Sequence, residues 1–259
     1  MLIDTHCHID VEEFAADRDG VMARARAAGV VAQVVPGVAQ PGWAHLLQVC
    51  RRYPGLYPAL GMHPVYLDVH RPGHLDELRA LVAQERPVAI GEIGLDHFVP
   101  GLDRAAQQAL FAAQLKIARD ADLPVILHVR KAIDPTLATL RRIRVKGGIA
   151  HAFNGSRQQA EQFLGLGFKL GFGGVATFER AQRIRRLLQE LPLEAVVLET
   201  DAPDLAPAWY KGGRNSPEYL PGILEAIATL RGENPTQVAV QTTANACEVF
   251  GLTVTDLNP

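Results

Sequence analysis

The chain has few cysteines, no long hydrophobic run and almost no net charge, and each shortage excludes a class of protein. Its three cysteines, Cys7, Cys50 and Cys247, are too few and too far apart for a disulfide framework or a Cys-x-x-Cys zinc site. We interpret them as small buried apolar residues, with Cys7 the one that could touch a metal. No apolar run reaches the roughly 20 residues of a membrane helix, and Leu2-Ile3-Asp4 does not begin a signal peptide. We therefore expect a cytoplasmic protein with no membrane partner and no evident obligate protein partner.

The charge balance limits the kind of partner that the whole surface can attract. A net charge of −2 and a pI near 6.5 give no global basic field for a long polyanion. Basic clusters occur at Arg141–Arg144 and Arg183–Arg186, but both fall on predicted helices, where we interpret them as solvent-exposed faces. DNA or another phosphodiester substrate would therefore have to be held locally.

The apolar content and the alternation of apolar segments predict the fold. Hydrophobic residues make up 48% of the 259 residues, enough for one large core, so we expect a single domain over residues 1–259. Predicted strands are Leu2–His6, Val30–Pro36, Tyr57–Gly61, Val88–Gly91, Val125–His128, Gly148–His151, Phe168–Gly173 and Ala195–Glu199. Helical stretches between and after them include Arg104–Asp120, Ser156–Gly165, Arg180–Leu191, Pro217–Leu230 and Pro235–Phe250. The fold class predicted is α/β, a TIM (β/α)8 barrel with an extra C-terminal helix.

The segment Asp4-Thr5-His6-Cys7-His8 follows the first apolar run and carries the first chemical signal. In an extended segment successive side chains alternate between two faces, so His6 and His8 share a face while Cys7 points away. Two imidazoles held side by side suit a borderline divalent cation, which then needs further ligands.

The further ligand candidates recur at the ends of the predicted strands. His63 follows the third strand, Glu92 follows the fourth, His128 and His151 end the fifth and sixth, and Asp201 follows the eighth. In this barrel the carboxyl ends of the strands form one rim, which holds the active site. We therefore predict that these residues meet there.

The number of candidate ligands favours two metal ions over one. Two cations that share a carboxylate fit four imidazoles and two acids better than one tetrahedral site does. Glu92 is the expected bridge. The expected shells are His6, His8, Glu92 and Asp201 for the first ion, and Glu92, His128 and His151 for the second. Asp201 could act as ligand or as general base, and the ions could be zinc, manganese or, less suited to histidines, magnesium.

Several of these segments, taken in order, resemble the signatures of one family. They are Asp4–His8, Gly61-Met62-His63-Pro64, Gly91–Asp96, His128-Val129-Arg130, His151–Ser156, Glu199–Pro203 and Arg214-Asn215. The chain is similar to the TatD family of metal-dependent hydrolases and deoxyribonucleases, particularly its YjjV-like branch. The resemblance implies a TIM barrel, a two-metal hydrolase, 3′→5′ exonuclease activity in several relatives, and metal-ligand roles for His6, His8, Glu92, His128, His151 and Asp201.

The chain departs from the family pattern at positions that we expect to line the substrate pocket, which are His97, Val129, Asn154 and Ser216. Among the other candidates we predict substrate contacts for His63, Arg130 and Arg214, because arginine forks suit phosphate oxygens. We expect Asp96 to orient a ligand histidine or a pocket loop. His45, His70 and His74 are predicted to face solvent.

The predicted activity is that of a phosphodiesterase. We expect a 3′→5′ exodeoxyribonuclease acting on DNA ends, in which two cations polarise the phosphate, a metal-bridging hydroxide attacks it, and Glu92 and Asp201 are the catalytic residues. The alternative is a metal-dependent hydrolase of a carboxylic ester or amide, such as an aminoacyl-tRNA ester or a cyclic amide, because the same centre can attack a carbonyl.

Overall fold

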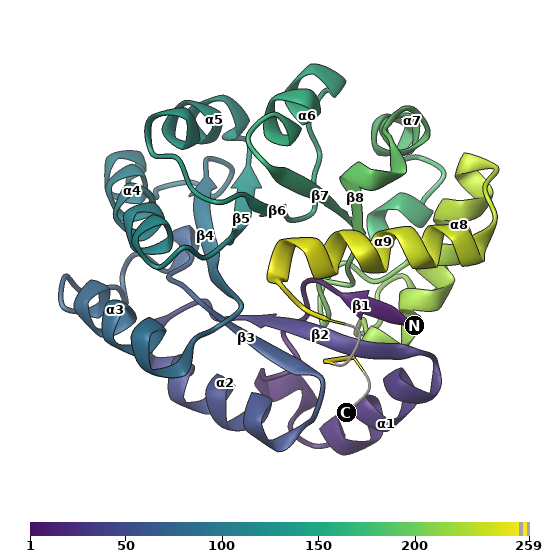
Figure 1. The fold of residues 1–259 in the computed structure, drawn as a ribbon, viewed down its shortest axis with the longest axis horizontal. Helices are drawn as coiled ribbons and strands as arrows, with labels where there is room; N and C mark the ends of the chain where they lie inside the picture. The colour runs from purple at the N-terminus through teal and green to yellow at the C-terminus, as the bar shows by residue number, and fades with distance from the viewer. Residues whose placement is uncertain (254–255, 258–259) are drawn as a thin grey trace.

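The computed structural model describes residues 1–253, 256 and 257, so the predicted domain end at residue 259 lies outside the described residues. Within this part, strands and helices alternate around a barrel of eight parallel strands (Figure 1). The strands are β1 (Leu2–Asp4), β2 (Val30–Pro36), β3 (Leu56–Leu60), β4 (Ala89–Asp96), β5 (Val125–Arg130), β6 (Gly148–Ala150), β7 (Phe168–Phe172) and β8 (Val196–Leu198). The helices are α1 (Arg18–Ala27), α2 (Gln40–Arg52), α3 (His74–Glu85), α4 (Arg104–Asp120), α5 (Ile133–Arg142), α6 (Arg157–Leu164), α7 (Gln182–Glu190), α8 (Leu220–Arg231) and α9 (Pro235–Phe250). The predicted TIM barrel with an extra C-terminal helix is confirmed.

The sheet runs in the order of the sequence and closes between its first and last strands. Each strand from β1 to β7 pairs in parallel with the strand that follows it in the sequence. The backbone N–H of Thr5 donates to the carbonyl of Leu198 at 3.0 Å, and that of Asp201 donates to the carbonyl of His6 at 2.8 Å. These bonds bring the segments that follow β1 and β8 together at the carboxyl end of the barrel.

The extra helix α9 begins and ends where the sequence predicts. Asn234 caps it by accepting from the N–H of Thr236 at 2.8 Å, and Pro235 takes the first turn. Gly251 ends it with a φ of 67°, a left-handed conformation that glycine adopts without a steric penalty. Predicted helix Pro217–Leu230 differs, because its first turn is a 3₁₀ helix, Pro217–Tyr219, before α8.

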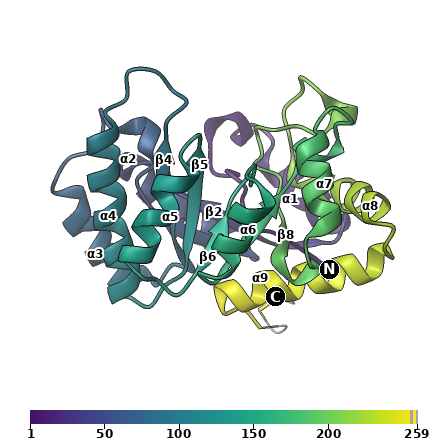
Figure 2. The same ribbon diagram turned by 90° about the horizontal axis from the view of Figure 1, so that it is seen from above.

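Helix α9 covers one end of the barrel and leaves the other open. Buried residues of the strands form an apolar layer with Ala246 and Phe250 of α9 and with Leu257, and this layer comprises Ile3, Ala32, Val34, Ala59, Ala89, Ile126, Ile149 and Val197. Figure 1 shows α9 crossing the barrel end, and Figure 2 shows it at the edge opposite the loops that follow the strands. The open, carboxyl end is where the site is expected.

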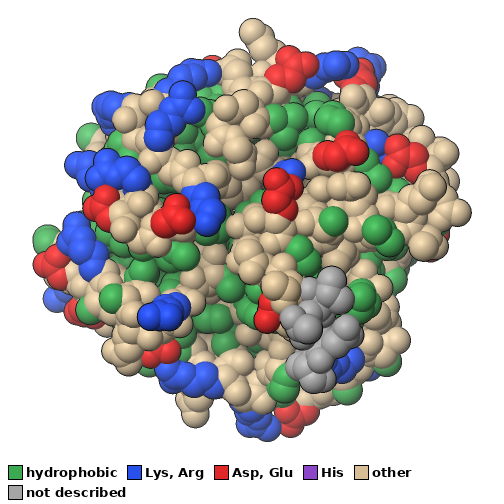
Figure 3. Space-filling model, viewed as in Figure 1, with side chains coloured by type: hydrophobic (Ala, Val, Ile, Leu, Met, Phe, Trp, Pro, Cys, Tyr) green, Lys and Arg blue, Asp and Glu red, His purple; other side chains and the backbone are tan. Residues whose placement is uncertain are grey.

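The surface seen from the α9 side carries no single-sign field. In Figure 3 the lysines and arginines lie interspersed with the acidic side chains, in agreement with the net charge of −2. No helix in the described residues combines the length and the apolar composition that crossing a bilayer requires.

Candidate metal centre

The strands deliver the predicted donors to the carboxyl end, but most of them end one to five residues from the predicted position, and β1 and β4 are two examples. Strand β1 ends at Asp4, so His6 and His8 lie on the segment after it rather than closing it. Strand β4 continues to Asp96, so Glu92 lies inside the strand, at a register irregularity between Ile90 and Ile93. These strands end later or earlier than the apolar run suggests, because backbone pairing with the neighbouring strand, not hydrophobicity, sets where a strand ends.

Four donor atoms converge on one point beside β1. The Nε2 atom of His6 lies 3.1 Å from His8 Nε2, 3.2 Å from Glu92 Oε2 and 3.5 Å from Asp201 Oδ1. The Nε2 atom of His8 lies 3.7 Å from the same oxygens of Glu92 and Asp201. For ligands about 2.1 Å from a tetrahedral ion, the separation between donors is roughly 3.4 Å. The donor set and its spacing therefore fit one divalent cation, with the four ligands predicted for the first ion.

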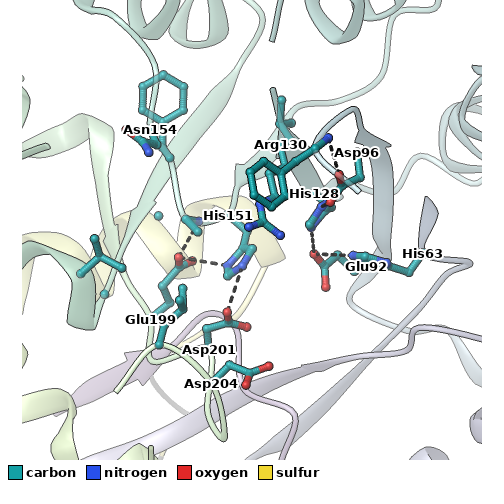
Figure 4. Close-up of a pocket in the computed structure, with 18 of the residues that line it drawn as sticks. His63, Glu92, Asp96, His128, Arg130, His151, Asn154, Glu199, Asp201 and Asp204 are labelled. Atoms are coloured by element: carbon teal, nitrogen blue, oxygen red, sulfur yellow. Dashed lines mark hydrogen bonds and ion pairs between the residues drawn. The ribbon is translucent and has the colours of Figure 1, made fainter. Parts of the chain in front are cut away.

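The other oxygen of Glu92 faces a different set of imidazoles (Figure 4). Glu92 Oε1 lies 3.0 Å from His128 Nδ1 and 3.4 Å from His63 Nε2. The two carboxylate oxygens thus belong to two separate donor clusters, which is the arrangement of a bridging carboxylate. His63, predicted as a substrate contact, also lies within reach of the same Glu92 oxygen as His128.

His151 joins the first cluster more closely than the second. Its ring stacks on His6 with 3.7 Å between centroids, and its Nε2 lies 3.6 Å from Asp201 Oδ2. Donor atoms of His6, Glu92 and His151 form one close group, whereas those of Glu92 and His128 group with His63. The donor atoms predicted for the second ion, those of Glu92, His128 and His151, are therefore divided between these two groups, and His63 joins Glu92 and His128.

Two further carboxylates lie behind the histidines, on the side away from the donor clusters. Asp96 Oδ2 lies 2.9 Å from His128 Nε2, as predicted for a residue that orients a ligand, and leaves Nδ1 facing Glu92. Glu199 Oε1 lies 3.0 Å from His151 Nδ1 and also accepts from the N–H of Ala152 at 2.6 Å. Such outer carboxylates fix which ring nitrogen is free for a metal.

Glu199 was missed by sequence reasoning, although a signal was present. It lies two residues before Asp201, which in an extended segment places both acids on one face. Space for its carboxylate comes from Gly171 on β7, where a Cβ atom would lie 2.1 Å from Glu199 Oε2. A glycine at the carboxyl end of the neighbouring strand is thus required by the buried acid.

The buried acids and imidazoles shift one another's pKa values. Burial opposes the charged form of Glu92, but the neighbouring charges of His63 and His6 outweigh it and hold the pKa of Glu92 well below its usual value. Burial likewise opposes a charged His151, but Glu199 and Asp201 raise its pKa well above normal. The pKa of Asp96 falls to about 2, because its bonds to His128, Val99 and Phe98 outweigh burial. An excess of ionised carboxylates among imidazoles is a setting that divalent cations neutralise.

Asp4 fixes the segment that carries these donors. Its carboxylate accepts from the backbone N–H of Thr200 at 2.9 Å and contacts the Thr200 hydroxyl at 2.5 Å. It is fully buried, and this burial raises its pKa to about 7 despite the hydrogen bonds. Asp201, which follows Thr200, has a left-handed φ of 59°, a strained conformation for a residue with a side chain. The Asp4–Thr200 contact therefore ties β1 to the turn that presents Asp201.

The donor clusters form the floor of a cavity of about 1070 Å³ at the carboxyl end of the barrel. Arg130 lines it, and its guanidinium lies over the Phe98 ring at 3.8 Å from the centroid. Arg214 does not line it. Both guanidinium nitrogens of Arg214 instead bind Asp17, at 2.8 and 2.6 Å, and its plane lies 4.5 Å from the Phe14 ring. The structure therefore keeps Arg214 apart from the other predicted site residues.

Arg183 of α7 is exposed, as predicted for its cluster, and it also lines the cavity. Its guanidinium donates to the backbone and side-chain oxygens of Asn154 at 3.1 and 2.5 Å. Of the four positions that depart from the family pattern, Val129 and Asn154 line the cavity, whereas His97 and Ser216 do not. Distance along the chain hides Arg183, because the loop after β6 and the helix after β7 meet only in the fold.

Two histidines and the cysteines complete the account of the predicted residues. His74 is buried and His70 half-buried, so the prediction that both face solvent is wrong, whereas His45 is exposed. The Nε2 atom of His70 lies 2.9 Å from the carbonyl of His63, and this contact supports the loop that carries His63. Cys7 and Cys50 are buried in the apolar core, as predicted, and Cys247 is half-buried.

Together the barrel, the open cavity and the converging imidazoles and carboxylates define a metal-dependent hydrolase of the TIM-barrel class. A family model described as "TatD related DNase" matches residues 3–251. The chain is 39% identical to the Escherichia coli K12 protein described as "Uncharacterized metal-dependent hydrolase YjjV", over 96% of this chain and 98% of that one. The chain therefore belongs to the TatD family, as the sequence motifs predict.

Two further comparisons agree with this membership. A Klebsiella pneumoniae protein named "3'-5' ssDNA/RNA exonuclease TatD" is 36% identical, over 98% of this chain and 99% of its own length. The crystal structure of YjjV from Escherichia coli K12 superposes with a TM-score of 0.94 at 38% identity and covers 97% of this chain and 98% of that chain.

Proposed function

We propose that this protein is a two-metal phosphodiesterase that removes nucleotides from the 3′ end of DNA. The observation that carries the proposal is the position of Glu92 between two donor clusters. Its Oε2 lies 3.2 Å from His6 Nε2, and its Oε1 lies 3.0 Å from His128 Nδ1. A carboxylate that presents one oxygen to each of two imidazole groups suits a pair of cations about 3.5–4 Å apart.

The chain's own residues divide the work of holding and activating. Zinc or manganese suits the histidine-rich donor set better than magnesium. His6, His8, Glu92 and Asp201 would hold one ion. Glu92, His128 and His151 would hold the other, although the donor atom of His151 groups with those of His6 and Glu92, and His63 lies beside Glu92 and His128. Such ions polarise a phosphate and lower the pKa of a nearby water molecule. Asp96 and Glu199 keep His128 and His151 in the required orientation.

Asp201 is the group that would take the proton from the attacking water. Its side chain is 15% exposed at the cavity floor, and its Oδ2 lies 3.6 Å from His151 Nε2. Burial opposes its charge, but His151, His6 and His8 hold the pKa of Asp201 below its usual value, so the carboxylate is ionised and able to accept a proton near neutral pH.

The nucleic-acid substrate is supported by the basic side of the cavity and by the family. Arg130 and Lys131 at the end of β5 and Arg183 on α7 line the cavity, where their donors suit phosphate oxygens. The Klebsiella pneumoniae relative is named an exonuclease of single-stranded DNA and RNA, and we extend that substrate class to this chain.

A second candidate, hydrolysis of an aminoacyl ester, is favoured by one observation. Exposed Glu13 and Asp204 line the cavity beside His8 and form an acidic side that would attract an ammonium group. Each aminoacyl ester carries such a group next to its scissile carbonyl. The same acids would repel a phosphate chain, which makes the two candidates separable by experiment.

The test combines metal analysis with a substrate comparison. Protein purified without chelator should contain about two equivalents of zinc or manganese. It should shorten a 5′-labelled single-stranded deoxyoligonucleotide stepwise, whereas a 3′-labelled strand should release its label first. An aminoacyl ester and a cyclic amide serve as the competing substrates. Rapid hydrolysis of either, with no cleavage of the oligonucleotide, would overturn the nuclease proposal in favour of the alternative.

The metal shells can be tested by a matched pair of variants. His151→Gln should lower metal content by about one equivalent, since His151 is assigned to the second ion, whereas His63→Gln should retain both ions and lose rate. The reverse result would make His63 the ligand of the second ion and His151 the supporting residue. The distance of 3.4 Å between His63 Nε2 and Glu92 Oε1 is compatible with that exchange.

A further inference from the structure

An exposed aromatic ring lies at the mouth of the cavity, in a position that the metal chemistry does not explain. Phe98 follows β4, lines the cavity and is 52% exposed. The guanidinium of Arg130 covers one face of the ring at 3.8 Å from its centroid. Because the arginine covers only that face, the ring remains accessible to a second flat group.

The ring is held in a fixed position relative to the metal donors. The backbone N–H groups of Phe98 and Val99 donate to Asp96 Oδ1 at 2.8 and 2.9 Å. The other oxygen of Asp96 lies 2.9 Å from His128 Nε2. In addition, the N–H of His97 donates to the carbonyl of Arg130 at 2.8 Å. One buried carboxylate therefore positions both a candidate metal ligand and the turn that carries the ring.

The charges on the cavity walls indicate along which side of the cavity a polyanion would bind. Arg130 and Lys131 lie on the same side as Phe98, at the carboxyl end of β5, and Figure 4 shows Arg130 beside His128 and Asp96. Glu13 and Asp204 line the side next to His8. A phosphate chain would therefore approach along the β4–β5 side, past the Phe98 ring.

We propose that Phe98, backed by Arg130, is the stacking platform for the base of the terminal nucleotide of a single-stranded nucleic acid. The inference rests on the proposed nuclease function and deepens it. Only an unpaired base offers a free face for stacking, so the platform selects single-stranded ends, and it does so without regard to sequence because every base has such a face. The in-plane N–H groups of Arg130 remain available to a phosphate oxygen while its face lies on the ring.

The experiment compares two ends of the same strand. One short 5′-labelled deoxyoligonucleotide carries a normal 3′-terminal thymidine, and the other carries an abasic residue there. The wild-type protein should show a KM about 10-fold higher for the abasic end, the usual worth of one stacked base. Phe98→Leu should raise KM for the normal end by about the same factor and leave KM for the abasic end unchanged. Phe98→Trp should keep the preference for the normal end.

Three controls separate the platform from other causes. Trp209→Leu changes an aromatic residue that is also 52% exposed but does not line the cavity, and it should behave like wild type. Metal content and hydrolysis of a fully abasic oligonucleotide, which carries no flat ring, should be unchanged in Phe98→Leu. An equal rise in KM for both ends in Phe98→Leu, or no rise for either, overturns the platform. Failure of the wild-type protein to cleave any phosphodiester overturns the proposed function instead.

Discussion

The two ends of this barrel are built from the same eight strands and have opposite chemistry. At the end covered by α9, the strands contribute an apolar layer that packs on Phe250 and Ala246. At the carboxyl end, the same strands and the turns after them place imidazoles and carboxylates within 4.8 Å of one another. The layer at one end is therefore apolar, and the other end has a cluster of imidazoles and carboxylates under a cavity.

The difference shows how stability and chemistry are kept apart. Burial of the apolar layer stabilises the barrel, since each large apolar side chain removed from water contributes about 1.5–3 kcal/mol. Burial of charge at the other end opposes folding, as the raised pKa of Asp4 shows. We expect changes at the metal centre to alter activity far more than stability, and changes under α9 to do the reverse.

The largest effect is expected for Glu92→Gln. The amide keeps the size of the side chain but loses the charge that faces both imidazole groups, so metal content should fall from about two equivalents to one or none. Phosphodiester hydrolysis should fall by at least about 10³-fold. Metal analysis and rate are measured on the same sample. Two firmly bound ions in this variant would remove Glu92 as the bridge.

The next effect is expected for Asp201→Asn, which separates a base from a ligand. If Asp201 acts as a base, its replacement should lower the rate by roughly 10²–10⁴-fold while most of the metal is retained. As a ligand, its replacement should empty the first cluster, and added metal should restore part of the rate. A metal titration of the variant decides between them. Near-native turnover at full occupancy would take Asp201 out of the reaction.

At the opposite end, Phe250→Ala should act on stability alone. Phe250 is 7% exposed and packs in the layer between α9 and the strands, so its truncation should cost about 3 kcal/mol of unfolding free energy. Metal content and kcat should remain at wild-type values below the unfolding transition. Denaturant unfolding gives the free energy, and Val240→Ala, at an exposed position of α9, is the control. Loss of metal in Phe250→Ala would contradict the separation of the two ends.

A pH-dependent effect of similar size is expected for Asp4→Asn in metal-free protein. Burial raises the pKa of Asp4 from 3.8 to about 7, so the folded state binds a proton that the unfolded state releases. The stability that this proton provides is complete below about pH 4 and is lost as the pH rises through 7, by up to about 4 kcal/mol. The Asn variant, which resembles protonated Asp4, should lack this slope. Denaturant unfolding at several pH values measures the difference, and parallel curves for both proteins would contradict it.

Much of the fold and most of the metal donors follow from local sequence. Apolar segments separated by helical ones predict the barrel, and Asn234, Pro235 and Gly251 predict both ends of α9. The donors His6, His8, Glu92 and Asp201 are recognisable because a barrel brings the carboxyl ends of all strands to one rim. The domain boundary at residue 259, the metal-ligand and catalytic roles, the two-ion count and the substrate contacts stay predictions.

Four features were decided only by tertiary structure. Glu199 behind His151, His63 beside Glu92, Arg183 on Asn154 and the pairing of Arg214 with Asp17 each join segments that are far apart in the chain. Periodicity and spacing report what a segment does with its own neighbours, so they predict strands, helix caps and the rim on which a residue lies. They carry no information about which side chain from another loop arrives within 4 Å. The packing of the whole barrel sets that distance. The distance in turn decides whether an arginine is free for substrate or is paired with a neighbouring acid.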